Sequence, residues 1–86
     1  MKESQAGSVE SCDCRITVRK QQGNTIEVKS IVYELYGDHI KNLILDTLER
    51  QNIKDIYVLC EDKGAVDFVI VSRLVTALKR LENSDE

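Results

Sequence analysis

The side chains best suited to chemistry in this chain are its three cysteines and its single histidine. Cys12 and Cys14 lie two positions apart, a separation that does not favour an unstrained disulfide. A zinc site would need further ligands, because His39 is the only histidine that could complete a set with the cysteines. We therefore expect no metal site, with Cys14 and Cys60 as small core residues and Cys12 exposed and oxidisable. A redox or metal module built on these cysteines is the weaker alternative.

Acidic residues around a glycine form the second candidate set. Glu61, Asp62 and Asp67 could supply two carboxylates for general acid–base catalysis, although acidic residues around a turn more often cap it or face solvent. Arg73 could hold a phosphate or an acidic partner surface, whereas bridging to a nearby carboxylate is the commoner role of such an arginine. The sequence contains no Gly-rich phosphate loop, no His-Glu-x-x-His pair and no nucleophile elbow. These observations argue against a self-contained enzyme.

Length and composition are typical of one small globular domain. The 86 residues leave no room for a second core, and 42% hydrophobic with 31% charged residues is ordinary for a soluble chain. A net charge of −3 argues against a nucleic-acid binder, which needs a basic surface. The longest apolar runs, such as residues 68–71, are too short to cross a bilayer, and we expect no secretory signal because no basic start with an apolar stretch is present. We expect a cytoplasmic protein without a membrane or nucleic-acid partner.

The first thirteen residues show no sustained period and contain Ser, Gly and Gln, so residues 1–13 are expected to form a flexible N-terminal segment. Ser11 lies in this segment between Glu10 and Asp13. A reachable hydroxyl with flanking charges is what a modifying enzyme needs. On composition alone, however, Ser11 would be taken as an ordinary loop residue.

The next part of the chain alternates apolar and polar residues in two short runs. Residues 14–19 and 26–29 show the period of half-buried strands, and the Gln-Gln-Gly-Asn sequence at 21–24 favours a turn that joins them into a hairpin. Apolar residues then recur at helical spacing over residues 32–48.

The ends of this first helix are less clear from the sequence. Ser30 is a plausible N-cap, but Gly37 interrupts the pattern, so the helix could begin only at Asp38. Asn52 is a suitable left-handed residue to end it.

Residues 55–61 are apolar on both faces, as in a strand inside a sheet, and Asp-Lys-Gly at 62–64 interrupts them. A second amphipathic helix is expected over residues 66–81. A strand is the alternative for residues 66–71, because residues 69–71 are all β-branched. Residues 83–86 are expected to form a frayed acidic tail.

This order predicts a two-layer α+β domain with β-hairpin–helix–strand–helix order and both helices packed on one sheet face. Residues 14–82 would form this single domain, after the flexible segment and before the tail.

Three segments carry a resemblance. Residues 6–13 read Ala-Gly-Ser-Val-Glu-Ser-Cys-Asp, residues 36–40 read Tyr-Gly-Asp-His-Ile, and residues 62–67 read Asp-Lys-Gly-Ala-Val-Asp, with Arg73 after them. In this order and at these separations they resemble the acyl carrier protein (gamma subunit) of citrate lyase, from Ala6 to about Arg80. The Asp-Ser-Leu signature of fatty-acid carrier proteins is absent.

The resemblance implies a non-catalytic carrier subunit. Its modified serine falls on Ser11, which would bear a covalent phosphoribosyl-dephospho-CoA group through a phosphodiester, while Ser8 is not the attachment site. The group would be added by a dedicated transferase. It would carry acetyl and citryl thioesters between the CoA-transferase (alpha) and citryl-lyase (beta) subunits during cleavage of citrate to acetate and oxaloacetate.

Three positions depart from the family pattern. Cys12 replaces a small residue beside the modified serine, Phe68 stands where the family often has cysteine, and Val71 where an arginine is common. The first bears on the transferase's preference and the other two on partner contacts of the second helix. A small non-covalent interaction module, docking through its helix faces near Arg73, is the alternative function.

Overall fold

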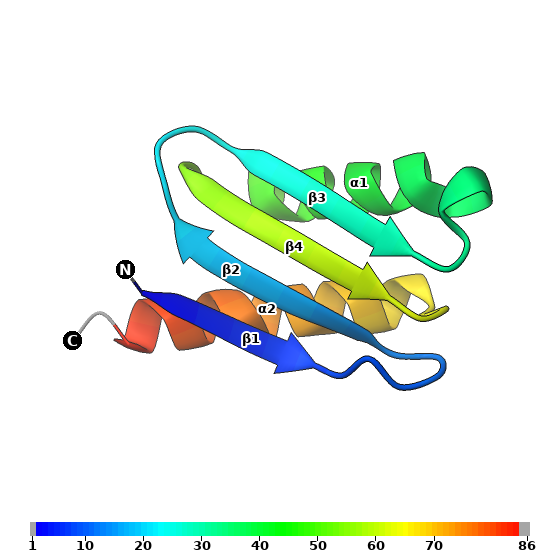
Figure 1. Ribbon diagram of the computed structural model, residues 1–86. Coiled ribbons are helices and arrows are strands. Elements are labelled where there is room, and N and C mark those ends of the chain that lie inside the picture. Colours follow the sequence, from blue (N-terminus) through cyan, green and yellow to red (C-terminus); the bar gives the residue numbers. More distant parts are fainter. Residues whose placement is uncertain (1, 85–86) are drawn as a thin grey trace.

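A four-stranded sheet carries both helices on one of its faces in the computed structural model, which describes residues 2–84 (Figure 1). The predicted two-layer α+β class, with helices on a single sheet face, is therefore confirmed. In chain order the elements are β1 (Glu3–Gly7), β2 (Cys14–Lys20), β3 (Thr25–Ser30), α1 (Tyr33–Arg50), β4 (Ile56–Asp62) and α2 (Asp67–Ser84).

The strand order β1-β2-β4-β3 corrects the predicted hairpin. β2 pairs antiparallel with β1 and with β4, and β3 pairs parallel with β4, so β2 and β3 are separated by β4. Parallel strands need a crossover connection, which α1 provides between β3 and β4. The prediction of an interior strand is confirmed by β4, whose residues are all buried or half-buried.

Residues 3–7 form an edge strand and not part of a flexible segment, which corrects the prediction for that stretch. Ala6 is 4% exposed and lies opposite Ile16 in the register of β1 with β2. The Ser4 hydroxyl donates to the Ala77 carbonyl of α2, and the Arg80 Nη1 donates to the Gln5 carbonyl at 2.7 Å. Small and polar side chains allow β1 to lie close to α2 without the apolar alternation that marks most strands.

The first helix begins at Tyr33, before the Asp38 start that Gly37 suggested and with Val32 in place of Ser30 as N-cap. Gly37 is buried inside the helix, and a Cβ there would lie 2.7 Å from the Tyr33 ring. The missing side chain therefore makes room for this ring. The expected left-handed Asn52 is confirmed, with φ 56° just after the helix.

The segment 66–71 is helical, because α2 begins at Asp67. The core lies between the sheet and the two helices, and Ile16, Val58, Ile44 and Leu74 are all completely buried in it. The frayed tail expected over residues 83–86 is wrong for 83–84, because α2 extends to Ser84. Residues 85–86, like Met1, lie outside the described residues. Neither helix within residues 2–84 has the length and hydropathy needed to span a membrane.

Candidate functional site

The segments that carry the resemblance converge at one end of the sheet (Figure 1). The β1–β2 loop, residues 8–13, lies beside the β4–α2 loop, residues 63–66. The Cys12 N–H donates to the Lys63 carbonyl at 2.9 Å, and the Lys63 N–H donates to the Asp13 carbonyl at 2.9 Å. These backbone bonds join two loops that are fifty residues apart in sequence, which sequence patterns alone do not reveal.

Ser11 lies exposed in the turn at the tip of the β1–β2 loop. Its Oγ lies 3.8 Å from the Cys12 Sγ and makes no shorter hydrogen bond with residues 2–84. Cys12 is exposed and takes a left-handed conformation with φ 65°. The Ser11 hydroxyl is therefore exposed to solvent, a condition that the expected modification of this serine would require.

The base of the same loop is held by Asp13. Its carboxylate accepts hydrogen bonds from the Ser8 hydroxyl at 2.8 Å and from the Cys14 N–H at 2.7 Å. Arg73 of α2 adds two more, from Nε at 3.0 Å and Nη2 at 3.2 Å. Arg73 thus has the bridging role that the sequence analysis gave as the commoner one. The loop is anchored at its base while Ser11 projects from its tip.

These contacts make the Asp13 carboxyl unusually acidic, since the Arg73 hydrogen bond, the Ser8 hydroxyl and the Cys14 N–H lower its pKa from 3.8 to about 2. Because the pKa of Asp13 is lower in the folded state than in the unfolded state, the ionised carboxylate stabilises the fold at pH values above about 4. This stabilisation is lost as the pH falls from about 4 to about 2.

We expect Arg73→Leu to raise the Asp13 pKa toward 3.8, measured by carbon NMR titration of the carboxyl group. The control Arg80→Leu should leave it unchanged, and an equally low pKa in Arg73→Leu would contradict this assignment.

The acidic residues around the glycine do not form a catalytic pair. Glu61 accepts two hydrogen bonds from Arg15, at 3.0 and 3.2 Å. Asp62 is 2% exposed and accepts from the Ser30 hydroxyl at 2.7 Å and the Ala65 N–H at 2.9 Å. Asp67 contacts His39 Nε2 at 2.8 Å. Each carboxylate therefore has its own partner, and the buried Asp62 caps the turn.

A pocket of about 500 Å³ lies between the first turns of the two helices. Tyr36, His39 and Ile40 line it from α1, and Gly64 and Val66 line it from the segment before α2. The second and third motif segments therefore face the same hollow. This juxtaposition was not predicted, because the two segments are separated in sequence by the rest of α1 and nearly all of β4.

Two residues that line this pocket have large exposed apolar side chains, and so do three residues that are next to a lining residue in sequence. Leu35 is 83% exposed, Phe68 78%, Val66 66%, Ile31 64% and Tyr36 54%. We call these five residues the apolar collar. Large apolar side chains exposed near one pocket of a small domain commonly mark an interaction site.

The three cysteines have the placement expected from the sequence. Cys14 and Cys60 are completely buried, and Cys12 is exposed. A hydrogen bond with Cys14 and burial raise the pKa of the Cys60 thiol, so this thiol stays protonated. No cluster of three or more metal-ligating side chains occurs within residues 2–84.

Comparison with known proteins agrees with the resemblance. A family profile of acyl carrier proteins, described as malonate decarboxylase delta subunit (MdcD), matches residues 1–81. The citrate lyase acyl carrier protein of Halothermothrix orenii is 39% identical over 82 residues, which cover 94% of this chain and 87% of the relative. That of Oenococcus oeni is 38% identical over 86 residues, covering 99% and 89%.

A solved structure has the same fold. It is a chain of a Pseudomonas malonate decarboxylase hetero-tetramer in complex with malonate, with a TM-score of 0.80 and 20% identity. The match covers 92% of this chain and 82% of that chain. At this level of identity the likeness concerns the fold alone.

Proposed function

Because the chain belongs to the citrate lyase acyl carrier protein family, we propose that it carries acyl groups on a prosthetic arm attached to Ser11. The proposed arm is phosphoribosyl-dephospho-CoA, joined to the serine oxygen by a phosphodiester. The observation that carries this proposal is the exposed Ser11 hydroxyl, which has no competing hydrogen bond shorter than 3.8 Å within residues 2–84. A primary hydroxyl with this access is suited to phosphodiester formation.

The residues of the loop have two different roles in the proposed tether. Asp13 and Arg73 fix the base of the loop to α2, so the attachment point keeps a defined position on the domain. Ser11 at the tip leaves the arm free to extend into solvent. The arm would supply the thiol that bears the acyl group, so none of the chain's own cysteines is required for carriage.

The chain is proposed to act without catalysing the reaction itself. Its carboxylates are occupied in structural contacts, as described for Glu61, Asp62 and Asp67. The chemical steps would take place on the alpha (CoA-transferase) and beta (citryl-lyase) subunits. Tethering makes each encounter of the acyl group with these sites intramolecular, at an effective concentration in the millimolar range or above.

The apolar collar is the proposed contact surface for these subunits. Ile31 of the collar and Val9 of the Ser11 loop line a common groove, so the collar adjoins the attachment loop. A partner that covers the collar would bring its active site within reach of the arm. The structural relative belongs to a hetero-tetramer, which supports a role for this fold beside other subunits.

Acyl loading tests the proposal. Protein that carries the prosthetic arm is incubated with the two larger subunits and a radiolabelled acetyl donor. We expect it to retain label that neutral hydroxylamine releases, as a thioester should. Unmodified chain is the control and should retain none. Label retained only from a malonyl donor would assign the chain to a decarboxylase. A complex that cleaves citrate with no acyl group ever bound to this chain would favour the non-covalent interaction module.

A further inference from the structure

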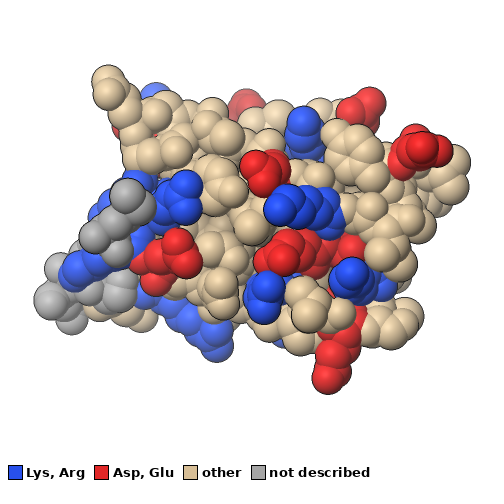
Figure 2. Space-filling view, viewed as in Figure 1, with Lys and Arg blue, Asp and Glu red and all other residues tan. Residues whose placement is uncertain are grey.

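A second hollow is lined by residues of the β1–β2 loop, the sheet and the β4–α2 loop, on the face of the sheet that no helix covers. Figure 2 shows this face, where basic and acidic side chains lie close to one another. The hollow has a volume of about 440 Å³. It is lined by Val9 from the attachment loop, by Arg15 of β2, Lys29 of β3 and Lys63 of the β4–α2 loop, and by two carboxylates. We call it the cationic groove, because its three cations outnumber its two carboxylates.

The two carboxylates of the groove are already occupied. Glu61 lies beside Lys29 in the parallel register, but its oxygens take both hydrogen bonds of the Arg15 guanidinium. Asp62 is buried beneath the surface, where Ser30 and Ala65 donate to it. Neither carboxylate therefore forms an ion pair with Lys29 or Lys63.

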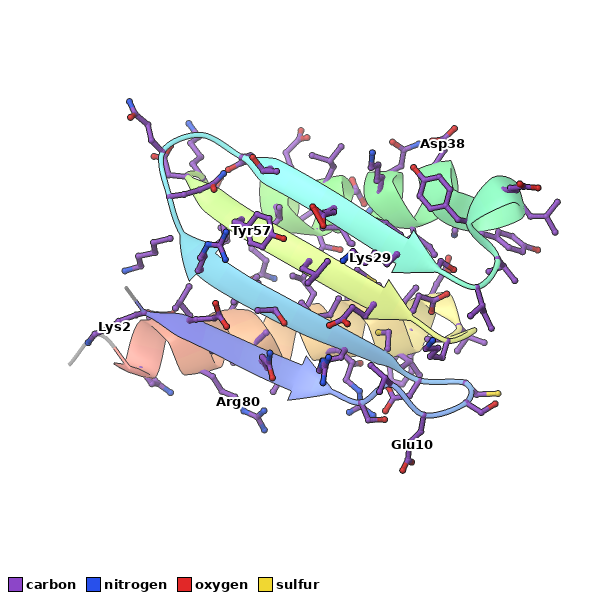
Figure 3. All side chains as sticks on the ribbon, viewed as in Figure 1. Lys2, Glu10, Lys29, Asp38, Tyr57 and Arg80 are labelled. Atoms are coloured by element: carbon purple, nitrogen blue, oxygen red, sulfur yellow. The ribbon has the colours of Figure 1, made fainter. Side chains whose placement is uncertain are left out.

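Lys29 and Lys63 are the other two cations of the groove, besides Arg15. Both side chains are exposed, and neither makes an ion pair with any residue between 2 and 84. Figure 3 shows Lys29 on the open sheet face, away from both helices. The three cations and two carboxylates leave a formal surplus of one positive charge, and two ammonium groups without an ion pair beside one hollow favour an anionic ligand.

Ser11 is close enough for its own arm to be that ligand. Val9, which lines the groove, is two residues from Ser11, a span of at most about 7 Å along the chain. Lys63, which also lines the groove, accepts a hydrogen bond through its carbonyl from Cys12, the neighbour of Ser11. We propose that the cationic groove holds the phosphate groups of the prosthetic arm, an inference that rests on the proposed function.

Docking in the groove would set the direction of the arm. The phosphates would lie along the open sheet face, while the thiol end beyond them stays free to reach a partner. Ion pairs with exposed lysines are individually weak, so the docked and released states would exchange readily. The groove would thus restrict the space that the arm searches without holding the acyl group back.

The test uses the full chain with its arm, after mass spectrometry has verified the increment at Ser11. A docked arm tumbles with the protein and gives broad phosphorus NMR lines. In Lys29→Ala/Lys63→Ala we expect narrower lines and a docked-to-free ratio lowered about fivefold, the effect of two exposed ion pairs. The control Lys54→Ala/Lys79→Ala removes two exposed charges that lie outside the groove and should keep the broad lines. Lys29→Arg/Lys63→Arg should also keep them.

Equal line widths in the two alanine double variants, with the arm present in both, would contradict docking of the arm in the groove and leave the carrier proposal intact. Absence of the arm's mass would contradict both. Free coenzyme A, equimolar with the unmodified chain, is expected to leave the amide resonances of the groove unchanged because it lacks the tether. Its saturation of the groove at micromolar concentration would assign the site to a diffusible nucleotide and overturn the proposal.

Discussion

Replacing Ser11 with alanine is expected to abolish citrate cleavage by the assembled complex, to the background of the assay. The chain would lose the proposed attachment atom, and free acyl donors cannot restore the effective concentration that a tether supplies. Effective molarities of positioned reactants make a loss of about a thousandfold or more the expected result. The measurement is oxaloacetate formation by complexes reconstituted with wild-type or variant chain that was produced with the transferase.

Two controls make this result specific. Ser11 is exposed and its hydroxyl makes only the 3.8 Å contact, so Ser11→Ala should leave the unfolding midpoint unchanged. Ser8→Ala removes a hydroxyl that donates to Asp13 at 2.8 Å, and the arm should still attach in this variant. Full activity of Ser11→Ala, or loss of the arm from Ser8→Ala alone, would show that Ser11 is not the attachment point.

Gly7→Ala is expected to lower the free energy of unfolding by about 4 kcal/mol and to displace the Ser11 loop. Gly7 has φ +92°, and a Cβ there would lie 1.9 Å from the Cys14 carbonyl oxygen and 3.0 Å from the Arg73 side chain. The backbone strain costs about 1–2 kcal/mol, and the clash with main-chain atoms forces a further rearrangement. Because Arg73 must move as well, its ion pair with Asp13 should weaken.

Gly64→Ala is the matched control, with nearly the same φ but open space around an added Cβ. Its φ is +93°, and the nearest atom to an added Cβ is the Ile31 Cδ1 at 3.8 Å. Only the backbone strain applies, so the expected loss in the free energy of unfolding is about 1–2 kcal/mol. Urea unfolding of both variants measures the difference, and similar losses in the two would show that the contact with Cys14 does not limit the fold.

Local sequence patterns predicted those elements whose side chains repeat with a clear period. The apolar residues on both faces of β4 indicated its interior place, and the spacing in residues 66–81 indicated α2. The edge strand β1 was missed, because its inward residues Ser4 and Ala6 are not large and apolar. The hairpin was wrong for a different reason: alternation shows that a strand is half-buried but not which strand pairs with it.

The candidate site depended on sequence resemblance more than on pattern. Ser11 has no local feature that separates it from other exposed serines, and only the family motif singled it out. The anchoring of its loop needs Asp13 and Arg73, sixty residues apart, to meet across the fold. The burial of Asp62 was also not predicted, because a charged residue near a glycine usually indicates a solvated turn.

The most direct test of the account is the mass of this chain when it is isolated from an active citrate lyase preparation. Intact mass spectrometry should show a single increment equal to phosphoribosyl-dephospho-CoA, and fragmentation should place it on the peptide that contains Ser11. An active preparation in which the chain has its unmodified mass, or in which the increment lies on another residue, would contradict the account.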